Sequence, residues 1–267
     1  MLIFVLSSFA YITCIKFTNK NFEVDCQLVD QLPNDKKIIN FTAGGGNWIY
    51  YMGIARFLQE NYDLNDVNLI GTSAGTLPAT MLANKIHIDT AMNKMLADDL
   101  HKMRQLYWGL MNFFCIYCIK NTQRYYNMLC KIDGNNKRLY VCVSEIDGFR
   151  LKKRYFTGGS LESMNICGFI SAWIPFITAP FFQPFCKINN RLYFDGFISG
   201  SRDYTDKENT LVIYPRVFRR KPLWKYWIWF NADYNFAEYN EGYEDAKSNK
   251  KRLDVFLGKN SPNRISQ

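Results

Sequence analysis

Histidine is scarce in this chain of 267 residues, which contains only His87 and His101. Glycine and proline are also few, at 16 and 8 residues, which excludes a collagen-like or low-complexity architecture. Hydrophobic residues make up 48% and charged residues 21% of the chain, a balance that excludes a disordered chain and a polytopic membrane protein. We therefore expect a globular protein that consists mainly of one large domain.

The net charge of +9 comes from 33 basic and 24 acidic residues. Such a surface could face nucleic acid, an anionic membrane or an acidic partner. No zinc-finger spacing, basic-zipper pattern or aromatic ribonucleoprotein signature accompanies the charge. The sequence therefore favours a membrane surface as partner and predicts no nucleic-acid partner.

The eight cysteines give little sign of a metal site. Cys115 and Cys118 form a lone C-x-x-C pair inside an apolar segment, and no second pair follows. A single pair is weak evidence for zinc or redox chemistry, and packing within a helix explains it as well. We therefore expect neither a metal nor a cofactor.

The chain divides into three segments by composition. Residues 1–35 hold an apolar run, Leu2 to Ile15, and a polar lead-in. The run is shorter than the roughly 20 residues of a spanning helix, but its length fits the core of a signal peptide. It is interpreted as a targeting or anchoring segment, or as a strand or helix packed on the domain. Residues 36–230 form the predicted α/β domain, and residues 231–267 form a polar C-terminal tail that we expect to be partly ordered at best.

Strand-like and helix-like segments alternate within the domain. Predicted strands cover residues 37–41, 67–70, 139–144, 151–156 and 191–194, and predicted helices cover 49–60, 76–85, 88–131 and 161–177. The last of these helices is expected to end before Pro175 or to bend there. This alternation predicts an α/β protein with three layers, α/β/α, around a mostly parallel central sheet.

Residues Gly71-Thr72-Ser73-Ala74-Gly75 match the pattern G-x-S-x-G between a predicted strand and a predicted helix. A strand that turns sharply into a helix holds the serine in a strained conformation, so the flanking residues must be small, as Gly71 and Gly75 are. The serine hydroxyl then lies beside the helix N-terminus, whose free N–H groups favour a developing anion. The pattern predicts that Ser73 is a nucleophile. The alternative is a serine that caps a helix without chemistry.

Neither histidine suits the role of a base for Ser73. His87 follows Ser73 at the far end of the same predicted helix, about 20 Å away at 1.5 Å per residue. Residues 102–267 contain no histidine, whereas α/β-hydrolases place theirs late in the chain. A Ser-His-Asp triad is therefore not expected.

A carboxylate is the remaining candidate base. Asp195 ends a predicted strand, and Tyr193, Phe194 and Phe197 around it would partly desolvate the carboxyl group. Desolvation raises a carboxyl pKa and makes the group a better proton acceptor. The alternative is an ordinary turn aspartate before Gly196.

These segments, taken in order, resemble the patatin-like phospholipases, including the adiponutrin-type branch. The matching text lies between about residues 36 and 200 and comprises Tyr51–Ile54, Gly71–Leu77, Val143–Gly148, Ser171–Pro175 and Tyr193–Gly196. The resemblance implies a patatin-like fold and a lipid acyl hydrolase with a Ser-Asp dyad, in which Ser73 is the nucleophile and Asp195 the base. It also implies an oxyanion hole formed by the backbone N–H groups of Gly44, Gly45 and Gly46, and a lipid ester as substrate.

The chain departs from the family pattern at two places. The family turn reads G-G-G-x-Arg/Lys-Gly, whereas this chain has Ala43, Asn47 and Trp48 at the first glycine, the basic and the last glycine positions. The family's Asp-Gly-Gly is here Asp195-Gly196-Phe197. A second hypothesis follows: a lipid-binding or membrane-docking protein that keeps the fold without turnover.

The region after the Asp-Gly pair interleaves basic and aromatic side chains. Tryptophan prefers the headgroup layer of a membrane, and each lysine or arginine near an anionic surface contributes about 1 kcal/mol. The sequence thus predicts membrane association, with docking to a membrane or lipid-droplet surface, and the alternative is a packed element with a solvated basic face. The residues expected to dock are Arg219, Arg220, Lys221, Trp224 and Trp227.

Overall fold

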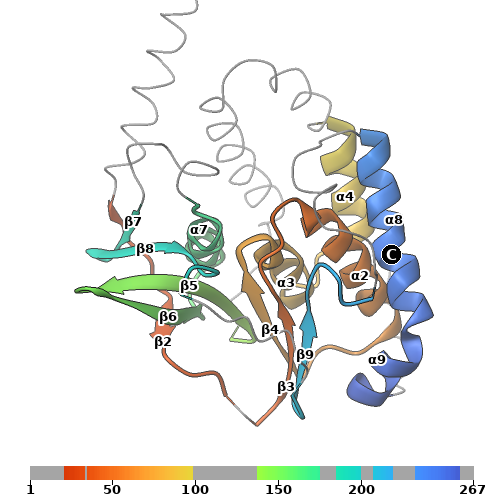
Figure 1. Cartoon of the computed structure of the whole chain (residues 1–267), viewed down its shortest axis with the longest axis horizontal. Helices are drawn as coiled ribbons and strands as arrows, with labels where there is room; N and C mark the ends of the chain where they lie inside the picture. The colour runs from red at the N-terminus through yellow and green to blue at the C-terminus, as the bar shows by residue number, and fades with distance from the viewer. Residues whose placement is uncertain are drawn as a thin grey trace, which may run out of the picture.

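The computed structural model of the chain describes residues 21–33, 35–98, 137–174, 185–199, 207–218 and 232–258. These residues form a mixed α/β structure with a mostly parallel central sheet, which confirms the predicted α/β class and the predicted parallel sheet (Figure 1). The N-terminal apolar run, most of the helix predicted for 88–131 and the predicted docking segment lie outside the described residues.

The centre of the sheet is parallel, in the order β9-β3-β4-β5. Strands β6 and β8 run antiparallel to β5 on its two edges. Beyond them, β2 pairs with β6, and β7 and β1 follow β8. The strands are β1 (Asn21–Phe22), β2 (Gln27–Val29), β3 (Lys37–Phe41), β4 (Val67–Thr72), β5 (Leu139–Asp147), β6 (Arg150–Thr157), β7 (Cys186–Ile188), β8 (Arg191–Asp195) and β9 (Thr210–Ile213).

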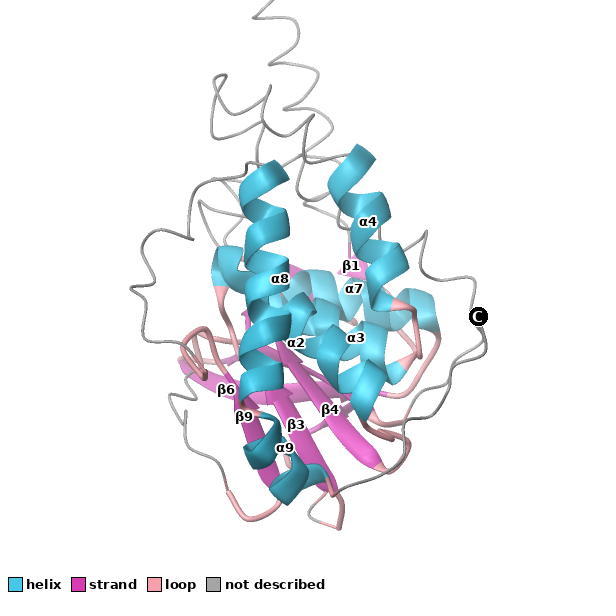
Figure 2. Cartoon of the chain, turned by 90° about the vertical axis from the view of Figure 1, so that its right-hand side faces the viewer, coloured by secondary structure: helices cyan, strands magenta, loops and turns pink. Residues whose placement is uncertain are grey.

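Two sets of alternating residues bury the two faces of the sheet. Ile39, Phe41 and Val141 pack with the helices in the main core, whereas Ile38 and Tyr140 belong to a smaller cluster on the other face. Burial on both faces explains why the central strands read as continuous apolar runs. Figure 2 shows the helices in front of the sheet. They are α2 (Trp48–Asn61), α3 (Thr76–Ala83), α4 (Ile88–Asp98), α7 (Leu161–Ser171), α8 (Ala232–Ser248) and α9 (Lys250–Leu257), with short 3-10 turns η1 (Gly45–Asn47) and η2 (Ser73–Gly75).

The C-terminal segment differs from the partly ordered tail that its polarity predicts. It forms α8 and α9, and α8 lies along α2 (Figures 1 and 2). A Cβ atom on Gly53 would lie 2.0 Å from the carbonyl oxygen of Tyr239, and one on Gly242 would lie 2.1 Å from that of Tyr50. The two helix backbones therefore pack directly against each other, which lets a helix with few apolar residues join the domain.

The N-terminal boundary also differs from the prediction, because β1 and β2 precede residue 36 and belong to the same sheet. Helix α7 stops at Ser171, so the helix predicted over 161–177 ends before Pro175 and does not bend there. Among the helices of the described ranges, none combines the length and the apolar character needed to cross a membrane.

Candidate active site

The register of β5 brings two distant segments together. Strand β4 runs parallel to β5, and its last pair is Thr72 with Cys142. Strand β8 runs antiparallel on the same edge, since β6 occupies the other one, and ends with Asp195 opposite Val143. The carboxyl ends of β4 and β8 thus meet at consecutive residues of β5, and Ser73, which follows β4, lies next to Asp195.

Ser73 has the backbone conformation of a nucleophile elbow. Its φ is 52°, in the left-handed region that a residue with a Cβ rarely adopts, and its side chain is buried. A Cβ on Gly71 would lie 2.4 Å from the Cα of Thr76, and one on Gly75 would lie 2.2 Å from the carbonyl oxygen of Phe41. Only glycine fits on either side of the serine, as the sequence pattern predicts.

Asp195 is 1% exposed. Burial raises the pKa of its carboxyl group to about 6, although the Ser73 hydroxyl and the Phe197 N–H each act to lower it. The Phe197 N–H donates to Oδ1 at 2.8 Å. Within the described ranges, Oδ2 is buried and accepts no hydrogen bond of normal geometry. The Ser73 hydroxyl lies close enough to act on the pKa of the Asp195 carboxyl group, and hydrogen bonds of this kind in active sites often tighten only when substrate binds.

The backbone N–H and the backbone carbonyl oxygen of Asp195 both form hydrogen bonds. Its N–H donates to the carbonyl oxygen of Trp173 at 2.9 Å, and its carbonyl oxygen accepts from the Ser144 hydroxyl at 2.7 Å. The same hydroxyl accepts from the N–H of Ser199 at 2.8 Å. Ser144 and Trp173 lie in two of the segments that carry the family resemblance, but sequence reasoning assigned them no role because these contacts arise from strand register.

The glycine turn after β3 lies beside the elbow, since η1 packs against η2. Gly45 has a φ of 54°, a conformation that glycine adopts without strain. The Asn47 side chain donates to the carbonyl oxygen of Gly44 at 2.8 Å and holds the turn closed. The backbone N–H groups of Gly44, Gly45 and Gly46 donate to none of the described residues.

The departures from the family pattern cost no backbone strain. Trp48 is helical, with φ −56° and ψ −31°. In the described part of the chain, the non-glycine residues with positive φ are Ser73, Lys85, Asn189 and Asn190, and Phe197 is not one of them. The chain therefore accommodates a large side chain at both positions where the family has glycine.

Neither histidine is placed by the structure at Ser73 or Asp195. His87 is exposed, and its Nδ1 lies 2.8 Å from the Thr90 hydroxyl. His101 lies outside the described residues. Among those that are described, no group of three or more histidine, cysteine, aspartate or glutamate side chains could hold a metal ion.

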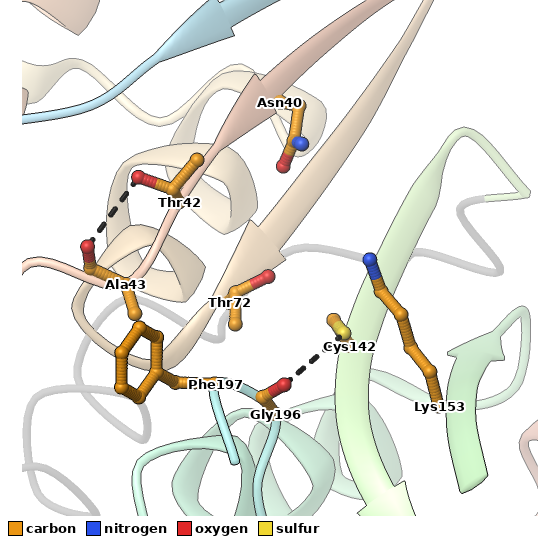
Figure 3. A pocket seen from close by; sticks show the side chains of 8 residues that line it. All are labelled: Asn40, Thr42, Ala43, Thr72, Cys142, Lys153, Gly196 and Phe197. Carbon is orange, nitrogen blue, oxygen red and sulfur yellow. Dashed lines mark hydrogen bonds between the residues drawn. The ribbon is translucent and has the colours of Figure 1, made fainter. Parts of the chain in front are cut away.

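A cavity of about 10 Å³ lies against the loop that follows Asp195 (Figure 3). It has room for about one water molecule. Burial raises the pKa of the Cys142 thiol in its wall to about 11, so that thiol is neutral at physiological pH. The lining residues are Asn40, Thr42, Ala43, Thr72, Cys142, Lys153, Gly196 and Phe197.

Comparison with known proteins adds little. No protein-family model matches the chain, and no curated protein does. Among solved structures, the chain is similar to the crystal structure of VipD from Legionella pneumophila, with a TM-score of 0.39 and 14% sequence identity. The match covers 73% of this chain and 54% of VipD, so the chain spans about half of that protein's length. A likeness this weak carries no argument about function, which has to come from the site itself.

Proposed function

We propose that this chain is a patatin-like serine hydrolase that cleaves lipid esters with a Ser73–Asp195 dyad. One observation carries the proposal: a serine in the left-handed elbow conformation lies beside a buried aspartate whose pKa is raised to about 6. A carboxylate of that pKa is ionised at neutral pH, yet it is more basic than an ordinary aspartate. It can therefore take the proton of a serine hydroxyl without an imidazole between them.

The reaction proceeds in two steps. Asp195 accepts the proton of Ser73 as Oγ attacks the ester carbonyl, and the oxyanion receives hydrogen bonds from the N–H groups of the turn formed by Gly44, Gly45 and Gly46. Asp195 then returns the proton to the departing alcohol, which leaves an acyl-serine. Water, deprotonated by Asp195, releases the fatty acid, and the proton returns to Ser73.

The surface near the dyad supports an apolar substrate. Phe197 and Ile198 directly follow the base and are 49% and 41% exposed. The ring of Phe185, also exposed, lies 5.9 Å from that of Phe194. Exposed apolar side chains at the rim of a site fit a lipid better than a polar ester. Docking through Arg219, Arg220, Lys221, Trp224 and Trp227 to a membrane or lipid-droplet surface belongs to the same proposal.

Hydrolysis by purified variants tests the proposal. Wild type, Ser73→Ala and Asp195→Asn are compared on a panel of phospholipid, triacylglycerol and retinyl ester. We expect both variants to lose activity by at least about 10³-fold, as the removal of a nucleophile or its base does in other hydrolases. Ser163→Ala, a buried serine of α7 whose hydroxyl bonds Ser160 and Asp25, serves as the matched control. Equal hydrolysis by wild type and Ser73→Ala would refute the proposal.

A lipid-binding protein without turnover is the second candidate, because the exposed side chains of Phe197 and Ile198 fit a bound lipid as well as a substrate. A fluorophosphonate probe separates the two. Covalent labelling of Ser73 supports an activated nucleophile, whereas binding to vesicles without labelling supports the binding protein.

A further inference from the structure

The hydrogen-bond ladder between β4 and β5 follows a regular alternation up to the elbow. The Leu69 N–H donates to the carbonyl oxygen of Arg138 at 2.8 Å, and Leu69 lies opposite Leu139. In a parallel ladder, every second residue of a strand donates to the same neighbour. Ser73 follows Leu69 by four residues, which is two repeats of this pattern. A regular ladder would therefore have the N–H of Ser73 donate to the carbonyl oxygen of Cys142.

A side chain from α7 takes that place. The Ser73 N–H donates to the Ser171 hydroxyl at 2.9 Å, and the Ser171 hydroxyl donates to the Cys142 carbonyl oxygen at 2.5 Å. Ser171 is completely buried. Its hydroxyl thus lies between the Ser73 N–H and the Cys142 carbonyl oxygen and forms a hydrogen bond with each, in place of the direct bond of a regular ladder.

The Ser171 hydroxyl lies at the point where β5 changes its pairing partner from β4 to β8. One residue further along β5, Val143 pairs with Asp195 instead of with β4. The carbonyl oxygen of Ser171 also accepts from the N–H of Gly196 at 3.3 Å. Ser171, the last residue of α7, therefore contacts both the nucleophile and the loop of the base.

We infer that Ser171 is a positioning residue, whose hydroxyl parts β4 from β5 and sets Ser73 at the spacing from Asp195 that the reaction requires. The inference rests on the proposed function and adds a third residue to the same site. Without the hydroxyl, the Ser73 N–H either closes onto Cys142, which draws the nucleophile away from Asp195, or stays buried without a partner. Both outcomes slow the chemical step and leave substrate binding unchanged.

Two measurements on the full chain test the inference, amide hydrogen exchange at Ser73 by NMR and the rate at which a fluorophosphonate labels Ser73. In Ser171→Ala, we expect exchange at Ser73 to become at least 10-fold faster or its amide resonance to shift. We also expect labelling to slow by about 10- to 100-fold, with kcat falling and KM unchanged. Ser171→Thr, which keeps the hydroxyl, should restore labelling. Ser163→Ala on the same helix should change neither quantity.

Two results would overturn the inference: an unchanged Ser73 amide in Ser171→Ala, or a changed amide with an unchanged labelling rate. If Ser171→Ala does not fold, Ser171→Cys takes its place, because a thiol has similar shape and weaker hydrogen bonds. If the wild type is not labelled at all, the proposed function fails. The Ser73 amide measurement in Ser171→Ala then shows by itself whether the Ser171 hydroxyl bonds the Ser73 N–H.

Discussion

Ser73 and Asp195 meet because the strands that carry them, β4 and β8, end opposite neighbouring residues of one long strand, β5. A parallel strand and an antiparallel strand share the same edge of β5 and point at each other end to end. The site is thus a consequence of sheet register. It places a strained serine next to a buried carboxylate, because both residues stand at the ends of strands that pair with β5.

The proposed function predicts that the pH dependence of hydrolysis follows the ionisation of Asp195. Because burial raises the pKa of this carboxyl group to about 6, and only the ionised form accepts a proton, kcat/KM should be constant above about pH 7 and fall as pH drops through 6. A soluble short-chain ester measured between pH 4 and 9 gives the profile. His87→Asn should leave the acid limb in place. A limb that disappears in this variant would assign the base to histidine instead.

Replacement of the base should stabilise the protein at neutral pH. Since the pKa of Asp195 is higher in the folded than in the unfolded chain, its contribution to stability falls as pH rises from about 4 to about 6 and stays low above that. Asp195→Asn removes this cost, so its free energy of unfolding should exceed that of wild type by on the order of 2–3 kcal/mol at pH 8. Urea unfolding at pH 4 should show a much smaller difference. A variant less stable than wild type at pH 8 would contradict the account.

The strain at Ser73 can be measured with two variants that both lack the hydroxyl. The φ of 52° costs an alanine about 1 kcal/mol and a glycine nothing. We therefore expect Ser73→Gly to unfold at higher urea than Ser73→Ala. At Ser199, whose φ is not positive, the order should be reversed or absent. Equal stability of the two Ser73 variants would mean that the elbow is relaxed.

The contact between α2 and α8 should not tolerate a methyl group. In Gly242→Ala, the added carbon would lie 2.1 Å from the carbonyl oxygen of Tyr50, and the helices would have to move apart, at a cost of about 2 kcal/mol or more. Gly148→Ala is the control, because nothing lies within 4 Å of its added carbon and only its φ of 59° is unfavourable. Thermal unfolding compares them. A Gly242→Ala variant as stable as wild type would show that α8 does not pack as described.

Much of the central sheet could be predicted from the sequence, because its strands are apolar runs and its turns carry glycine. Ser73 was found from a local pattern whose steric demand is specific. Asp195 was singled out among the carboxylates because it ends a predicted strand and has Tyr193, Phe194 and Phe197 around it. Both predictions rest on residues that are close together in the sequence.

The remaining features depend on pairing across long distances. Ser171 begins a segment that carries the family resemblance, Ser171–Pro175, but the contact of its hydroxyl with Cys142 depends on the register of β4 and β5. Helix α8 was predicted to be a tail because hydrophobic periodicity detects apolar side chains, whereas this helix joins the core largely through the close approach at Gly53 and Gly242. The contacts of the Ser171 hydroxyl and of the two helix backbones cannot be derived from a local pattern in the sequence.

The most direct test of the account is the rate at which a fluorophosphonate modifies Ser73, located by peptide mass, in wild type and in Asp195→Asn at pH 8. If Asp195 activates the serine without an imidazole, wild type is labelled at Ser73 and the variant at least about 100-fold more slowly, while His87→Asn matches wild type. Equal labelling of wild type and Asp195→Asn, or labelling that avoids Ser73, would contradict it.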